Sequence, residues 1–170
     1  ILLAHIIEEA SGQSYADYLD QVIFTPLKMH STGYPNGSIG EEVVLYRDGL
    51  ARTGIKGRMF PHPISEGAGG LYSSLEDLFL WSQALYTEQL LHKSELEGMF
   101  EPEVPDTEIP GFGGSRGYPI SAGGGGGTSP FGTIIIRFPQ DRLTVIVLAN
   151  QYIDQMSFWV LIANELWGKT

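Results

Sequence analysis

The first apolar residues of the chain repeat every three or four positions, which predicts an amphipathic helix. They are Leu2, Leu3, Ile6, Ile7 and Ala10. Ser11-Gly12 follows as a typical C-terminal stop. Ser14 and Asp17 then have the spacing of an N-terminal cap, which predicts a second helix that ends at Pro26. The chain therefore opens with two short helices.

A third helix is predicted where Ser73 and Glu76 match a capping box, and it extends to about Tyr86. Its apolar stripe is expected to face inward. The stripe consists of Leu75, Leu78, Phe79, Ser82 and Leu85. A short helix is predicted near residues 94–100, and an amphipathic helix is expected to close the chain. The inward positions of this closing helix are Met156, Trp159, Val160, Ala163 and Trp167.

Two runs rich in β-branched and aromatic residues, 133–138 and 143–148, flank a turn-forming segment at 139–142. They predict a buried antiparallel hairpin. Five consecutive glycines at 123–127 precede the hairpin and do not fit a helix. Backbone without side chains beside a firm sheet suits a site where main-chain N–H groups approach a ligand, although composition alone also fits a plain surface loop.

The remaining segments predict irregular structure. Residues 27–70 carry Gly and Pro throughout, with one apolar run at 43–46, and indicate a long, partly extended excursion. Residues 101–119 are rich in Pro and Gly as well. Helices at both ends and an antiparallel hairpin late in the chain predict an α+β fold, in which an antiparallel sheet is flanked by helices. The length of 170 residues suits one domain or a large part of one.

Charge and composition exclude some classes of function. The formal net charge of −10 argues against nucleic acid or an anionic membrane as the main partner. No run of about 18 apolar residues occurs, so no transmembrane segment is expected. The chain has no cysteine, which excludes disulfide and thiolate chemistry. The four histidines lack the spacing of metal ligands, so no metal site is predicted.

Four blocks along the chain carry a resemblance to a known family. They are residues 2–12, residues 23–33 with Phe-Thr-Pro-Leu and Ser-Thr-Gly, residues 67–78 with Gly-Ala-Gly-Gly-Leu-Tyr-Ser-Ser, and residues 125–150. In this order they resemble the serine β-lactamase and penicillin-binding-protein-like family, in the branch of class C β-lactamases, D-alanyl-D-alanine carboxypeptidases and related esterases. The resemblance implies a β-lactamase/transpeptidase-like fold, no cofactor, and a periplasmic or extracellular location in a bacterium.

The family's nucleophile motif, Ser-x-x-Lys, occurs nowhere in the 170 residues. Residues 25–28 and 53–56 have the spacing of Ser-x-x-Lys, but a threonine replaces the serine. Residues 34–36 spell Tyr-x-Asn, but they lie in a predicted turn after the helix that the family's Tyr-x-Asn should precede. In the family both motifs fall upstream of the position of Ile1. The resemblance therefore implies that residues 1–170 are the C-terminal part of one β-lactamase-like domain, whose N-terminal part with Ser-x-x-Lys and Tyr-x-Asn is absent.

The third family motif is a Lys/His-x-Gly strand beside the oxyanion hole, and it falls within the glycine run. Counting back from Phe131 places the family's Lys or His at Gly124, where the side chain is lost. The same count assigns the backbone N–H of the oxyanion hole to Gly127. A shifted register within the glycine run is the alternative to this loss. By the resemblance, three neighbouring residues contact the substrate: Gly125, Gly126 and Thr128.

Two other motifs have simpler interpretations. Residues 113–117 spell Gly-x-Ser-x-Gly, the nucleophile-elbow pattern of α/β-hydrolases, with Ser115 at its centre. An elbow needs a strand before it and a helix after it, whereas Pro105 and Pro110 precede this segment and Pro119 follows it. We interpret it as a coincidental Gly-rich loop. The five glycines lack the Lys-Ser/Thr of a phosphate-binding loop, which argues against nucleotide binding.

These observations predict the C-terminal portion of a serine hydrolase that acts through an acyl-enzyme on ester, amide or β-lactam substrates, with this chain inactive by itself. The alternative is a non-catalytic β-lactamase-like protein that binds peptidoglycan-like peptides or a protein partner. The expected macromolecular partner is the missing N-terminal half of the same protein or a second copy of the chain. The expected ligand is a small-molecule or peptide substrate.

Overall fold

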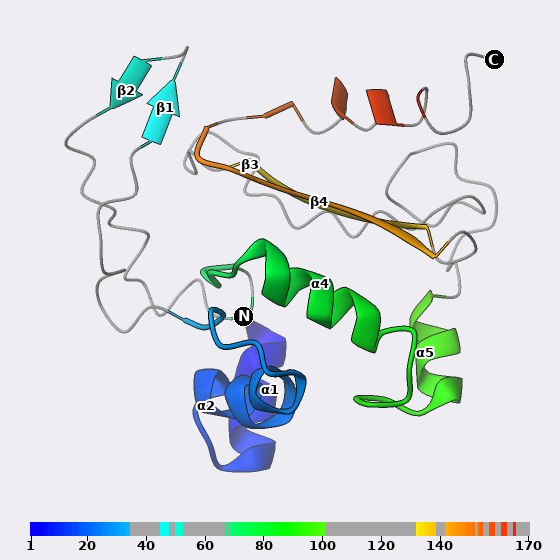
Figure 1. Ribbon diagram of the computed structural model, residues 1–170. Helices are drawn as coiled ribbons and strands as arrows, with labels where there is room; N and C mark the ends of the chain where they lie inside the picture. The colour runs from blue at the N-terminus through cyan, green and yellow to red at the C-terminus, as the bar shows by residue number, and fades with distance from the viewer. Residues whose placement is uncertain are drawn as a thin grey trace. The chain divides into compact units, whose positions relative to one another are not determined.

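The computed structural model describes two units of the chain (Figure 1). Unit 1 consists of Ile1–Val43 and Ile55–Leu96, and unit 2 consists of Val44–Gly54 and Glu97–Thr170. The described residues are 1–34, 45–47, 50–52, 67, 69–100, 132–138, 142–151, 153–154, 157–158, 161–162 and 165. They form helices and two small antiparallel sheets, which confirms the α+β fold class.

The first two helices begin and end largely as their local sequence requires. α1 (Leu2–Ser11) ends at Gly12, whose φ of 70° lies in the left-handed region that only glycine adopts without steric cost. α2 (Tyr15–Leu19) begins at Ser14, whose hydroxyl accepts the Asp17 N–H at 3.1 Å and donates to the Asp17 carboxylate at 2.6 Å. The predicted end of the first helix and the predicted start of the second are both confirmed.

The prediction that Pro26 ends the second helix is wrong. A π-helical turn, η1 (Asp20–Phe24), follows α2 directly and leads into α3 (Thr25–Leu27), which contains the proline. In a regular α-helix, the proline ring collides with the carbonyl four residues earlier, and the missing N–H leaves that carbonyl without its partner. The wider i→i−5 bonding of a π turn removes this conflict just ahead of the ring. The helical run therefore continues past Pro26 to Leu27.

The chain leaves α3 through Lys28, which has a positive φ of 59°. The Lys28 N–H donates to Thr25 O at 3.1 Å, and the Met29 N–H donates to Phe24 O at 2.8 Å. This pair of bonds defines a Schellman motif. It turns the chain back so that Met29 joins the apolar core of unit 1. That core consists of Leu19, Phe24, Leu27, Met29 and Ala84.

α4 (Leu75–Ala84) is the predicted third helix, with two corrections to its ends. Its N-terminal cap is Ser74, whose hydroxyl accepts the Asp77 N–H at 3.2 Å, and not Ser73. Two adjacent serines are each followed three residues later by a carboxylate, so the spacing alone fits both. The helix also ends before the predicted Tyr86.

The inward face of α4 differs in part from the predicted stripe. Ser82 and Leu85 are buried as predicted, whereas Leu75 and Phe79 are 47% and 52% exposed. Asp77 lies inward instead and is only 5% exposed. The face is thus rotated by roughly one residue position, about 100° around the helix. The carboxylate of Asp77 has to point inward to reach its hydrogen-bond donors, the Ser31 N–H and the Thr32 hydroxyl.

Unit 2 contains the predicted antiparallel hairpin, β3 (Gly132–Phe138) and β4 (Leu143–Ala149). The first residue of β3 pairs with the last of β4, and the register continues without interruption to the turn. Ile134 and Ile136 lie on one face of β3, as the two-residue period of a strand requires, and they form the core of this unit. Their apolar neighbours are Leu143, Val145, Val147, Ile153, Phe158 and Ile162.

The other predicted elements of the chain are covered only in part. A small hairpin of β1 (Leu45–Arg47) and β2 (Leu50–Arg52) lies within the predicted extended excursion, where the sequence indicated a single apolar run. α5 (Lys93–Phe100) confirms the short helix near residues 94–100. The irregular segment predicted at residues 101–119 lies outside the described residues.

The closing helix is confirmed only at a few positions. Phe158 and Ile162 are helical and lie one turn apart, and both pack on the β3–β4 core. The five inward positions that the sequence predicted for this helix lie outside the described residues. They are Met156, Trp159, Val160, Ala163 and Trp167.

Candidate functional site

The residues predicted to carry the chemistry lie outside the described part of the chain. They are Gly124, Gly125, Gly126, Gly127 and Thr128, together with Ser115 of the Gly-x-Ser-x-Gly motif. The described chain resumes at Gly132, where β3 begins. The roles of the glycine run therefore stay predictions.

The strand that follows the glycine run begins at a closely packed position. A Cβ at Gly132 would lie 2.8 Å from the carbonyl oxygen of Gln151 and would overlap the side chain of Ile153. The segment after β4 thus passes directly against the backbone of β3, and only glycine fits there. Gly132 is also buried. The glycine run therefore leads into a strand whose first residue is fixed by its neighbours.

A buried carboxylate in unit 1 joins the loop after α3 to the start of α4. The Oδ2 atom of Asp77 accepts hydrogen bonds from the Ser31 N–H and from the Thr32 hydroxyl, each at 2.7 Å. The Thr32 hydroxyl also lies 2.7 Å from the Ser73 hydroxyl. Hydrogen bonds to an ionised acceptor are stronger than those between neutral groups. We call these four residues, Ser31, Thr32, Ser73 and Asp77, the Asp77 cluster.

A backbone bridge lies beside the Asp77 cluster and joins the same two segments. Gly33 and Tyr72 exchange two hydrogen bonds, at 3.1 Å and 2.9 Å. A Cβ at Gly33 would lie 3.0 Å from the Tyr72 hydroxyl, so the approach is tight. The two segments belong to two of the four blocks of the family resemblance. Their contact gives a structural reason for the residues that both blocks carry.

The Asp77 cluster has a structural role, because no catalytic base contacts its hydroxyl groups in the described part of the chain. Activation of a serine or threonine hydroxyl needs an adjacent base such as His or Lys. The described donors to the Asp77 carboxylate are the Ser31 N–H and the Thr32 hydroxyl, and neither is such a base. The link spans 45 and 46 residues of sequence, so no local pattern could have predicted it.

The glycine-rich segment before α4 approaches α1 closely. Gly67 has a φ of 78°, and a Cβ there would lie 2.7 Å from the Ala4 Cβ. Its N–H donates to the Tyr34 hydroxyl at 3.3 Å, and the Tyr34 ring lies 5.8 Å from the Tyr15 ring between centroids. Both the conformation and the space at Gly67 exclude a side chain. The first glycine of this block is therefore needed for packing.

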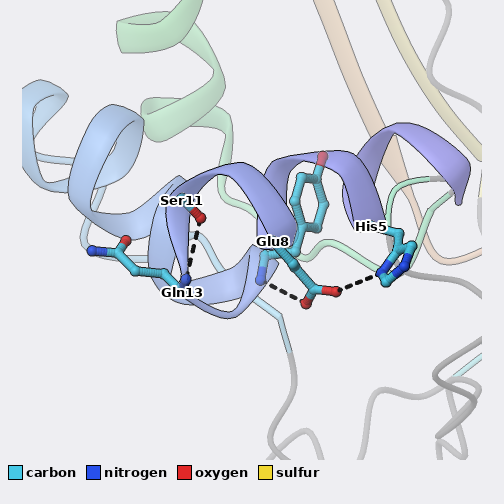
Figure 2. A network of polar contacts seen from close by, with 5 residues as sticks. His5, Glu8, Ser11 and Gln13 are labelled. Atoms are coloured by element: carbon cyan, nitrogen blue, oxygen red, sulfur yellow. Dashed lines mark hydrogen bonds and ion pairs between the residues drawn. The ribbon is translucent and has the colours of Figure 1, made fainter.

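Figure 2 shows a polar network at the C-terminal half of α1. One oxygen of the Glu8 carboxylate accepts the Tyr15 N–H at 3.0 Å, and the other lies 3.9 Å from Nδ1 of His5. Ser11 accepts the Gln13 N–H at 3.2 Å. A histidine beside a carboxylate occurs in catalytic triads, but this His5 side chain is 65% exposed and no hydroxyl nucleophile bonds to it in the network drawn. The network joins α1 to α2 and is structural.

The described residues show neither a metal-binding cluster nor a membrane-spanning helix. In that part of the chain, no three His, Asp or Glu side chains gather closely enough to hold a metal ion. Its helices are also too short or too polar to span a bilayer.

Comparisons with known proteins point to one family. The family model described as Beta-lactamase matches residues 1–158 of the chain. Penicillin-binding protein 4* of Bacillus subtilis is 31% identical over 176 residues, which cover 91% of this chain and 39% of that protein. The chain spans about two fifths of the length of the curated relatives it matches, with shares of 39% and 37%.

Solved structures share the fold. The octameric penicillin-binding protein homologue from Pyrococcus abyssi is similar with a TM-score of 0.68 and 23% identity, over 99% of this chain and 41% of that one. The D-amino acid amidase from Ochrobactrum anthropi SV3 is similar with a TM-score of 0.67 and 22% identity, over 96% of this chain and 51% of that one. The family match extends from α1 past β4, and the same fold recurs in these structures, so the chain belongs to the β-lactamase family, as its four sequence blocks predicted.

Proposed function

We propose that the chain is the C-terminal portion of a serine hydrolase that acts through an acyl-enzyme on ester, amide or β-lactam substrates. The observation that carries the proposal is the family match over residues 1–158, because this range includes the glycine run as well as the described helices and hairpin. The family is serine hydrolase-like, and its members among the relatives include a penicillin-binding protein and a D-amino acid amidase. Their names point to β-lactams and amides as the substrate classes.

In this proposal the glycine run forms one edge of the active site. The Gly127 N–H donates to the oxyanion of the tetrahedral intermediate, and the neighbouring backbone contacts the substrate. A preorganised backbone donor is worth roughly 3 kcal/mol of transition-state stabilisation. The count back from Phe131, within the range that the family model matches, supports this assignment. The substrate-contacting residues are Gly125, Gly126 and Thr128.

The chain by itself is proposed to be inactive. Its 170 residues contain no Ser-x-x-Lys, and Gly124 has no side chain to supply a charge or a proton at the family's Lys/His position. Without a nucleophile, covalent catalysis is lost, and only weak assistance from binding and the oxyanion hole is left. Activity therefore requires the N-terminal part of the domain. A second copy of the chain is the other candidate partner, and the octameric relative supports self-association.

The second candidate function is a non-catalytic relative that binds peptidoglycan-like peptides or a protein partner. The same two observations favour it: the absence of Ser-x-x-Lys from these residues and the glycine at position 124. A glycine-walled edge can still bind an extended peptide through backbone hydrogen bonds. The two functions differ in whether a covalent adduct forms.

Covalent labelling with a fluorescent penicillin separates the two functions. The 170-residue chain is labelled alone and after mixing with the polypeptide encoded upstream of Ile1 in the same reading frame, and adducts are located by intact-mass spectrometry. The proposal predicts no adduct on the chain alone and a serine adduct on the upstream polypeptide in the mixture. Reversible binding of a D-alanyl-D-alanine peptide by the mixture, without an adduct, would favour the binding protein. An adduct on the chain alone that disappears in Ser115→Ala would establish the nucleophile elbow instead.

A further inference from the structure

The two ends of the β3–β4 hairpin differ in charge. Gly132, the first residue of β3, pairs with Ala149, the last residue of β4. We call this the entry end, because the glycine run precedes it in the sequence. Arg137 and Arg142 lie toward the opposite end, where the turn joins the two strands. Arg137 is fully buried, and at about 3.3 Å per residue it lies roughly 17 Å along β3 from Gly132.

The described residues at the entry end carry no positive charge. Ile153 packs against Gly132 there, since a Cβ built at Gly132 would overlap the Ile153 side chain. Asp154 is the next residue, so its Cα lies about 3.8 Å from that of Ile153, and it is exposed. The charge described at the entry end is therefore negative. The residues considered are Gly132, Thr133, Leu148 and Ala149 of the strands, and Asn150, Gln151, Ile153 and Asp154 after β4.

The sequence on both sides of the glycine run is also uncharged. Residues 117–136 contain no Lys, Arg, His, Asp or Glu. At the family's Lys or His position the count from Phe131 predicts Gly124, so the cation expected there is lost. The chain as a whole has a formal net charge of −10, and a field of that sign repels anions. An anionic group at this edge of the site would meet repulsion and no compensating cation from these segments.

Charge matters at this edge because binding removes water from the substrate. A carboxylate without a cationic or hydrogen-bonding partner loses its hydration at a high cost, whereas a neutral ester or amide loses much less. We propose that the site selects acyl donors that carry no charge close to the scissile bond, neutral esters and amides, over those with a carboxylate there. This inference rests on the proposed function and narrows its ester, amide and β-lactam substrates by charge. It also makes Asp154 a residue that contributes to specificity.

Benzylpenicillin and its methyl ester test this selectivity, because they differ only in a carboxylate close to the scissile amide. Each compound is reacted with the chain mixed with the polypeptide encoded upstream of Ile1, and intact-mass spectrometry gives the second-order rate constant of acylation. The rate constant of each compound with hydroxylamine, an uncharged nucleophile, corrects for intrinsic reactivity. The proposal predicts a corrected rate constant at least about threefold larger for the ester. Added salt should raise the rate constant for benzylpenicillin, because it screens the repulsion, and leave that for the ester unchanged.

Three variants test whether the selectivity comes from this edge. Gly124→Lys supplies a cation and should shift the ratio of the two rate constants toward benzylpenicillin by at least about tenfold. Asp154→Asn removes the negative charge but keeps an oxygen for the Ser157 hydroxyl, which lies 2.6 Å from the carboxylate in the wild type. It should shift the ratio in the same direction by about twofold at low salt. Arg142→Gln is the control, because it removes a cation at the turn end of the same hairpin, and it should leave the ratio unchanged.

The ratio is measured within one variant, so a fraction of unfolded protein cancels. Equal corrected rate constants in the wild type, or a larger one for benzylpenicillin, overturn the proposal. Loss of that opposite preference in Arg116→Gln would then identify Arg116 as the cation. An unchanged ratio in Gly124→Lys contradicts the assignment of the selectivity to this edge. Equal shifts in Asp154→Asn and Arg142→Gln would assign it to the net charge of the chain instead.

The proposed function fails by a different readout. If neither compound forms an adduct with the mixture, the hydrolase is contradicted, and this inference with it. Adducts that form with no preference for the ester contradict the selectivity alone.

Discussion

The contacts that stabilise unit 1 join residues far apart in the sequence, whereas those that stabilise unit 2 join residues close together in the sequence. In unit 1, the Asp77 cluster and the Gly33–Tyr72 bridge join segments more than forty residues apart through hydrogen bonds. In unit 2, Ile134 and Ile136 pack mainly on the neighbouring strand and on the segment that follows it. A hydrogen-bonded cluster needs each partner in place, because an unsatisfied buried group is costly. An apolar core depends on volume and tolerates exchange between similar side chains. The units should therefore respond to different kinds of substitution.

The largest expected effect is on the hairpin. Ile134→Ala removes a nearly fully buried side chain and leaves a cavity, which should lower the free energy of unfolding by about 2–5 kcal/mol. Leu148→Ala is the control on the same hairpin, because Leu148 is 37% exposed. Urea unfolding gives the energies, and hydrogen exchange resolved by peptide gives the location. Faster exchange confined to residues 31–34, with β3 unchanged, would contradict this assignment of the effect.

A somewhat smaller effect is expected for the Asp77 cluster. Asp77→Ala leaves the Ser31 N–H and the Thr32 hydroxyl without their acceptor, and the free energy of unfolding should fall by about 2–4 kcal/mol. Asp77→Asn keeps one acceptor oxygen and should cost less. Glu76→Ala, at the exposed neighbouring position, should change little.

Hydrogen exchange locates the effect of Asp77→Ala. Residues 31–33 and 72 should exchange faster while β3 and β4 keep their protection. An unchanged rate at Ser31 would mean that its N–H does not depend on the carboxylate.

The smallest of the three effects concerns two glycines of one block. Gly67→Ala introduces a Cβ at a positive φ and against the Ala4 Cβ, and should lower the free energy of unfolding by about 1–3 kcal/mol. Gly69→Ala meets no atom within 4 Å and should stay within about 0.5 kcal/mol of the wild type. Thermal unfolding of both variants gives the comparison. Equal losses would show that the block needs glycine for a reason other than this contact.

The same difference between the units explains how far the sequence could predict the fold. The hairpin, the stop at Gly12 and the cap at Ser14 depend on neighbours within a few residues, and all three are confirmed. The continuation of the helix through Pro26 was missed, because a π turn changes backbone bonding without a distinct residue pattern. The inward face of α4 was missed because Asp77, a charged residue, is buried by partners far away in the sequence.

For the candidate site, the sequence could predict the family but not the geometry. Four short blocks were enough to predict the family. In the described residues, Gly12 and Gly67 have a positive φ, and Ser74 caps α4, so the fold restricts the residue at these positions. The blocks could not give the geometry of the glycine run, since a segment without side chains carries no periodicity from which register or direction follows. The assignment of Gly127 and Gly124 thus depends on a count from Phe131 and needs a functional measurement.

The most direct measurement is the rate constant for acylation by a fluorescent penicillin, compared between the wild-type chain and Gly126→Val, each mixed with the polypeptide encoded upstream of Ile1. A side chain at Gly126 would crowd the approach of the substrate carbonyl to the backbone N–H groups. Because one oxyanion donor is worth roughly 3 kcal/mol, acylation should slow about a hundredfold or more, with the melting temperature nearly unchanged. Acylation of both proteins at the same rate, an equally large loss of stability in the variant, or no acylation of the wild type would contradict the account.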